Sequence, residues 1–71
     1  MYNLENAVSR VENAIASSKL PTITLNDLCE LTGLTVVDAH ITCIFLDRHY
    51  RLSYDINGPG KVSRLAGNQY D

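Results

Sequence analysis

Two cysteines and two histidines are the residues of this chain best suited to binding a metal ion. They are Cys29, His40, Cys43 and His49. Zinc ribbons and fingers take their ligands from close pairs two to five residues apart. The four residues do not form two such pairs. We therefore expect no metal site, but two buried thiols and two histidines at the surface.

No arrangement of residues indicates catalysis. The run Asp47-Arg48-His49 consists of neighbours on a helix, and such neighbours do not face each other. Asn57-Gly58-Pro59-Gly60 is a hairpin tip rather than a phosphate-binding loop, because its proline removes an amide donor. None of the serines lies in a strand-turn-helix elbow. We expect a protein that is not an enzyme and has no cofactor and no small-molecule substrate.

Length and composition point to one small domain over residues 1–71. A chain of 71 residues buries only about 60% of its unfolded surface, so a partner or a second copy would add stability. Two cysteines are too few for the disulfide framework of a small secreted domain, which predicts reduced thiols in the cytoplasm. We expect no signal peptide and no membrane span. The net charge of -2 is unusual for a dedicated nucleic-acid binder.

The first helix is predicted from one apolar stripe, followed by a proline. The stripe repeats with spacings of four, three and four residues and consists of Leu4, Val8, Val11 and Ile15. Asn3 is a suitable N-cap. Residues 17–19 end the helix before Pro21, which cannot continue it.

Two further helices follow a short β-branched segment at residues 21–24. Thr24 with Asp27, and Thr35 with Asp38, are helix-start signatures close to the capping box. Gly33 suits a left-handed C-cap between the two helices, the second of which is predicted to run to about His49.

A change to period-two alternation predicts a hairpin after the third helix. The apolar positions of its first strand are Tyr50, Leu52, Tyr54 and Ile56. We expect Tyr50 and Tyr54 to cover the core, the turn at residues 57–60 to be exposed, and residues 61–65 to form the returning strand. Residues 66–71 are polar and predict a loose tail.

The order helix, short strand, helix, turn, helix, hairpin resembles the winged helix-turn-helix of bacterial and phage regulators. Residues 23–35 are similar to the helix-turn-helix of that superfamily, and residues 50–65 to its wing. The resemblance implies a mainly α fold with a small β-hairpin wing. It also implies a DNA-binding transcription regulator, commonly a homodimer, whose third helix enters the major groove.

The resemblance places candidate DNA contacts on the third helix and the wing. They are Arg48, Arg51, Lys61, Arg64 and His40. Arg48 is the single base-reading residue type on the third helix, and Asp38 near its entering end would repel phosphates. Arg51, Lys61 and Arg64 could give phosphate contacts, which position a protein without reading sequence.

Two apolar stripes on the third helix favour a different function. One contains Val36, Ala39, Cys43 and Leu46, and polar residues such as Thr42 separate it from the other. The second stripe, Val37, Ile41, Ile44 and Phe45, either packs against the wing or remains open as an interface for a second copy or a protein partner. The alternative to DNA binding is thus a protein-binding module, such as a phage or mobile-element inhibitor of a host enzyme or polymerase.

Overall fold

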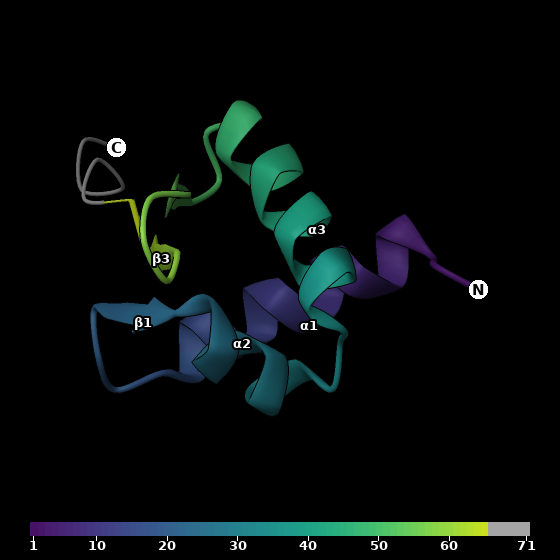
Figure 1. Cartoon of the computed structure of the whole chain (residues 1–71), viewed down its shortest axis with the longest axis horizontal. Helices are drawn as coiled ribbons and strands as arrows, with labels where there is room; N and C mark the ends of the chain where they lie inside the picture. Colours follow the sequence, from purple (N-terminus) through teal and green to yellow (C-terminus); the bar gives the residue numbers. More distant parts are fainter. Residues whose placement is uncertain (66–71) are drawn as a thin grey trace.

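The computed structural model describes residues 1–65 and contains three helices and a small antiparallel sheet (Figure 1). In chain order the elements are α1 Leu4–Ser17, β1 Thr22–Thr24, α2 Leu25–Thr32, α3 Val36–Arg48, β2 Ser53–Asp55 and β3 Lys61–Ser63. The predicted mainly helical class with a β-hairpin is confirmed. The predicted tail at residues 66–71 lies outside the described residues.

Each helix begins at a side chain that satisfies a free backbone amide, as the sequence predicts. Asn3 accepts a hydrogen bond from the amide of Asn6 at 2.9 Å. Thr24 and Asp27 form a full capping box at the start of α2. Thr35 accepts from the amide of Asp38 at 3.1 Å. Because the caps lie where the apolar patterns begin, the starts of all three helices are fixed locally.

The sheet has the order β1-β3-β2, so the last strand of the chain lies in the middle. Ile23 and Tyr54 lie on either side of Val62. The hairpin is thus confirmed, but its strands are shorter than predicted, and Ile56 is exposed. The expectation of a fully exposed tip is wrong at Gly60, which is buried and whose carbonyl accepts from the amide of Leu25 at 3.0 Å.

Gly60 is the residue that lets the hairpin approach α2. Its φ of 78° favours glycine, and a Cβ there would lie 3.2 Å from the Cβ of Leu25. The sequence signal for a turn therefore also marks a packing contact.

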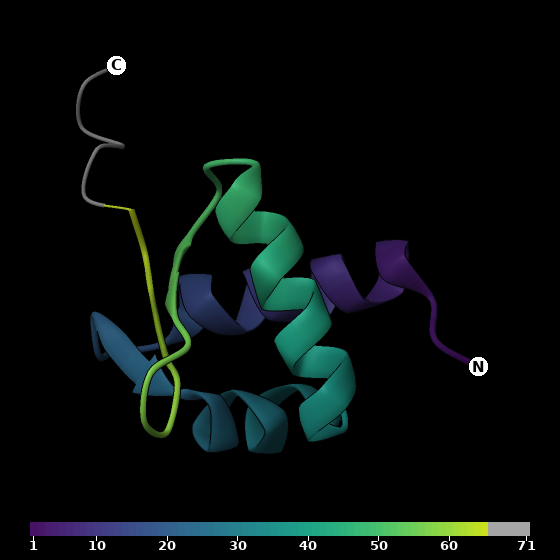
Figure 2. The ribbon, with the colours of Figure 1, turned by 45° about the horizontal axis from the view of Figure 1, so that its top comes forward.

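The core lies where α3 crosses α1 and packs against α2 and β2 (Figures 1 and 2). Its largest fully buried side chains are Leu28, Leu46, Leu52, Val11, Val62, Thr42 and Cys43. Burial of one such aliphatic side chain is worth about 1.5–3 kcal/mol. The predicted stripe on α1 is wrong at Leu4, which is 38% exposed, while Ala7 is buried in its place. The small side chain of Ala7 suits a close approach of helices.

Tyr50 ends α3 in a backbone conformation that normally belongs to glycine. Its φ is 59°. Its amide donates to the carbonyl of Asp47 at 3.1 Å, and the amide of Arg51 donates to that of Leu46 at 2.9 Å, which is the hydrogen-bond pair of a Schellman motif. The side chain is 84% exposed, so the expectation that Tyr50 covers the core is wrong.

We predict that glycine at position 50 stabilises the fold relative to alanine. Tyr50→Gly removes the Cβ that opposes a left-handed φ, whereas Tyr50→Ala retains it. The free energy of unfolding of Tyr50→Gly should therefore exceed that of Tyr50→Ala by about 1 kcal/mol, measured by urea denaturation. Equal stabilities would show that the left-handed turn is not present in solution.

Candidate functional site

One side of α3 faces the core and the opposite side faces solvent. Ala39, Cys43 and Leu46 are fully buried. At about 100° per residue, the positions farthest from them lie in one line along the helix. We call this line the outward row: Val37, Ile41, Ile44 and Arg48. Three of its four side chains are apolar.

Half of the second apolar stripe remains open. Val37 is 65% and Ile41 is 46% exposed, and Ile44 is half-buried. Phe45 differs, because it packs against the core and its ring lies 4.3 Å from that of His49. Val36 departs from the expected pattern as well: predicted on the core-facing stripe, it is 53% exposed. The exposed apolar surface of α3 therefore begins at its first turn.

Thr42 is buried in the core, where the sequence pattern predicts a polar divider between stripes. Its hydroxyl donates to the carbonyl of Asp38 at 2.7 Å. The same oxygen lies 2.6 Å from the hydroxyl of Tyr2, which therefore donates to it. This bond holds the segment before α1 against α3. Nothing in the sequence pattern marks the pair, because 40 residues separate its members.

His40 connects α3 to the hairpin instead of facing a ligand. Its Nδ1 lies 2.7 Å from the hydroxyl of Tyr54, and the two rings meet edge to face at 5.5 Å. Burial raises the pKa of Tyr54, with a smaller contribution from the nearby cysteines. A side chain engaged in this way is poorly placed to contact DNA.

Two of the three candidate cations that follow α3 bind to α1. Arg51 forms an ion pair with Glu12 at 2.6 Å. Arg64 donates to the carbonyls of Ile15 at 3.0 Å and Ser18 at 3.4 Å. The Arg64 contacts place positive charge at the C-terminal end of α1, whose last turn has no basic residue of its own. The two arginines therefore fasten the segment after α3 to the first helix.

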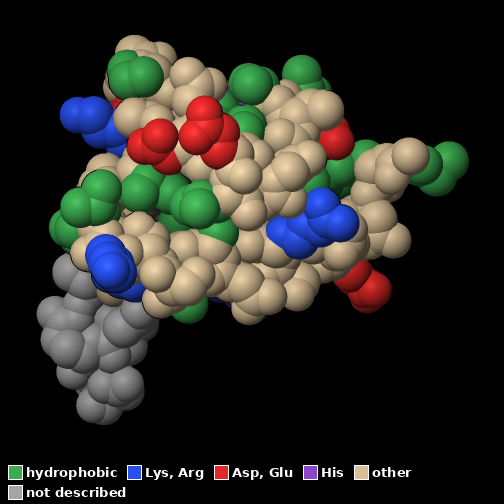
Figure 3. Space-filling model, turned by 90° about the horizontal axis from the view of Figure 1, so that it is seen from below, with side chains coloured by type: hydrophobic (Ala, Val, Ile, Leu, Met, Phe, Trp, Pro, Cys, Tyr) green, Lys and Arg blue, Asp and Glu red, His purple; other side chains and the backbone are tan. Residues whose placement is uncertain are grey.

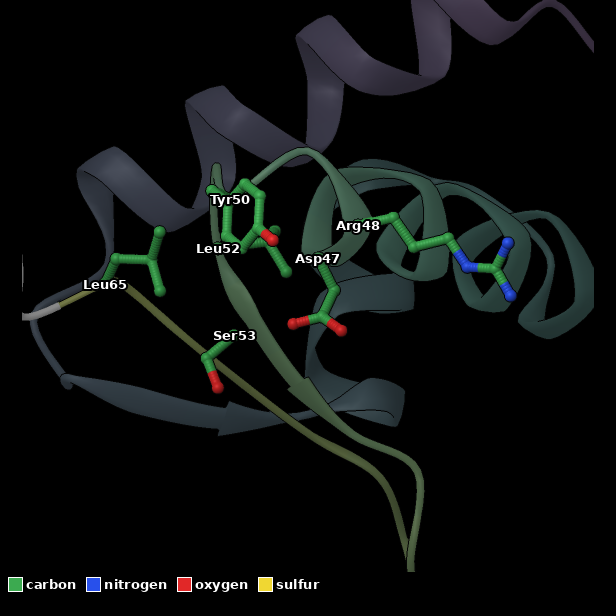
Figure 4. Close-up of a pocket in the computed structure, with 6 residues that line it drawn as sticks. All are labelled: Asp47, Arg48, Tyr50, Leu52, Ser53 and Leu65. Carbon is green, nitrogen blue, oxygen red and sulfur yellow. The ribbon is translucent and has the colours of Figure 1, made fainter.

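Arg48 and Lys61 are the other candidate cations, and both are exposed. Neither forms an ion pair within residues 1–65. A shallow hollow of about 410 Å³ is lined by residues that include Asp47, Arg48 and Tyr50, but the guanidinium of Arg48 points away from the others (Figure 4). The face seen from below carries separate basic side chains among acidic and hydrophobic ones, with no continuous basic patch outside the grey residues (Figure 3).

The cysteines are free thiols inside the fold. Cys43 is fully buried, and burial raises its pKa to about 12. Cys29 is half-buried, and burial followed by the charge of Glu30 raises its pKa too. Both shifts favour the neutral thiol, which is unreactive. Across residues 1–65, no three histidine, cysteine or acidic side chains gather as metal ligands would.

No single helix of residues 1–65 has the length and apolar character needed to cross a membrane. The helices α2 and α3 pass that test only when they are taken together, by length and composition. The pair is bent by 106° at the break between the two helices.

Comparison with known proteins gives no relative: no protein-family model matches the chain, and neither a curated protein nor a solved structure is significantly similar to it.

We predict that the two hairpin cations differ in their effect on stability. Arg64→Ala should lower the free energy of unfolding by about 1 kcal/mol, because it leaves the carbonyls of Ile15 and of the C-cap Ser18 without their charged donor. Lys61→Ala, the matched control three residues earlier in the chain, should change it by less than about 0.5 kcal/mol. Thermal and urea denaturation of both variants would measure the difference. Equal effects would mean that Arg64 does not fasten the hairpin to α1.

Proposed function

We propose that the chain is a winged helix-turn-helix domain. The element order and the β1-β3-β2 sheet support this assignment. The angle of 106° between α2 and α3 falls within the range of helix-turn-helix units, about 90–120°. Gly33, in a left-handed conformation, lies in the short turn between them.

We further propose that this domain is a non-enzymatic protein-binding module whose contact surface is the outward row of α3. The observation that carries the proposal is the exposure of Val37 and Ile41, at 65% and 46%, on the helix that organises the core. Exposed apolar side chains grouped on one element mark interaction sites more often than isolated ones do. The free thiols Cys29 and Cys43 suit a cytoplasmic protein.

The charges favour a protein partner over DNA. Of the five candidate DNA contacts, His40, Arg51 and Arg64 are engaged inside the domain. A protein that binds DNA draws most of its affinity from several phosphate contacts. Two exposed cations on different elements and a net charge of -2 supply few of them.

DNA binding is the second candidate. It is the function that the resemblance to winged helix-turn-helix regulators of transcription implies. The observation in its favour is that Arg48 and Lys61 lie exposed on α3 and on the hairpin, the two elements that contact DNA in this fold. Titration with generic duplex DNA at about 50 and 200 mM salt separates the candidates. Binding that falls steeply with salt would support DNA, and the protein-binding proposal requires its absence.

A photo-cross-linking residue at position 41 tests the proposed surface directly. In the cells that express the chain, a benzophenone amino acid replacing Ile41 should give a discrete protein adduct. The same residue replacing Asn13, which is exposed on α1, is the matched control and should give none. Ile41→Asp, added in excess, should not compete for the adduct, although circular dichroism should show it folded because Ile41 is half exposed.

Two results would contradict the proposal. One is the absence of an adduct specific to position 41. The other is loss of the helical signal in Ile41→Asp, because that would place Ile41 in the core rather than at an interface.

A further inference from the structure

The outward row has the spacing of a helix that packs along another helix. Its members follow each other at intervals of four, three and four residues, from Val37 to Arg48. That alternation keeps side chains on one seam and is the pattern by which paired helices interlock. The row continues through most of α3, so its natural complement is a helix of similar length rather than a loop or a small molecule.

A partner that adds a β-strand to the sheet beside α3 is disfavoured. The edge strand of the sheet that packs against α3 is β2, which is three residues long. The amide of Tyr54 at its centre donates to the carboxylate of Asp47 at 3.4 Å, which occupies the edge where a further strand would pair.

The row is complementary to itself when two copies run in opposite directions. Its midpoint falls between Ile41 and Ile44. In an antiparallel pair, Ile41 of each copy faces Ile44 of the other. The two contacts are related by the two-fold axis and lie on either side of it. Arg48 of each copy then lies over the first turn of the other helix, beside Val37 and Asp38.

Charge decides between the antiparallel and the parallel arrangement. Asp38 lies in the first turn of α3 and Arg48 in its last. Neither forms an ion pair within residues 1–65. Antiparallel packing brings Arg48 close to Asp38 of the other copy twice and opposes the two helix dipoles. Parallel packing would instead bring the two Arg48 side chains together.

We infer that the partner of the outward row is a second copy of this chain, bound through an antiparallel, two-fold α3–α3 contact with reciprocal Arg48–Asp38 pairs. The inference rests on the proposed protein-binding function of the row. A helix of 13 residues is only about 20 Å long, so the contact is smaller than a standard interface and the dimer dissociates readily.

Charge reversal tests the reciprocal pairs. Asp38 uses only its backbone inside the domain, donating to Thr35 and accepting from Thr42, so its side chain can be replaced without losing those bonds. In Arg48→Asp each pair becomes two carboxylates, and in Asp38→Arg it becomes two guanidinium groups. Sedimentation equilibrium between about 1 µM and 1 mM should show self-association of the wild type, weakened about tenfold in each variant.

An equimolar mixture of the two variants gives the sharpest result. Both pairs become complementary again in the heterodimer, so association should return to within about threefold of the wild type. Lys61→Asp, which reverses an exposed cation outside the row, is the matched control and should associate as the wild type does. Circular dichroism of every variant confirms that it is folded.

Three results would overturn the inference: a wild type that stays monomeric at about 1 mM, a mixture that does not recover, or a Lys61→Asp variant weakened as much as Arg48→Asp. The mass of the adduct from position 41 separates this inference from the proposed function. An adduct of twice 7.9 kDa supports the second copy. An adduct with another protein overturns the inference of a second copy but is consistent with the protein-binding function. The absence of any adduct contradicts both the inference and the proposed function.

Discussion

The packing of α3 against α1, α2 and β2 is the interaction on which the rest of the fold depends. Ala39, Cys43 and Leu46 are fully buried on one side of this helix, which packs against α1, α2 and β2. Among residues 1–65, no other helix or strand covers Val37, Ile41 and Arg48 on the opposite side. Val37 and Ile41 of the outward row are therefore exposed, whereas Ile44 is half-buried. The presence of apolar side chains at these exposed positions is the reason to assign them to a partner.

The basic residues illustrate a second constraint, since half of them act inside the domain. Arg10 donates to the carbonyl of Thr32 at the end of α2, and Arg64 donates to carbonyls at the end of α1. Arg51 pairs with Glu12. Neither of these two helices has a basic residue in its own last turn, so distant arginines supply the charge that favours a helix C-terminus. Positive charge that a DNA-binding domain would present outward is used here to join elements.

Local signals made the helices, their caps and the hairpin predictable, and long-range contacts account for what the sequence analysis missed. The caps at Asn3, Thr24 and Thr35 depend on residues three positions apart, which a sequence displays directly. The openness of the second stripe at Val37 and Ile41 was one of two alternatives, because periodicity cannot show which stripe a hairpin will cover. The roles of Arg51, Arg64 and Tyr2 depend on partners 39 to 49 residues away. The exposure of Tyr50 follows from the left-handed turn at that residue, which the period-two pattern of apolar residues does not reveal.

The most direct test of the account follows the backbone amide resonances of the ¹⁵N-labelled chain during dilution from about 1 mM to 10 µM. If the outward row is the contact surface between copies, the shifts that change should cluster on α3 around Val37, Ile41, Ile44 and Arg48. The amides of the hairpin and of the middle of α1 should stay constant. Changes centred on the hairpin or on α1, or no changes at all, would contradict the account.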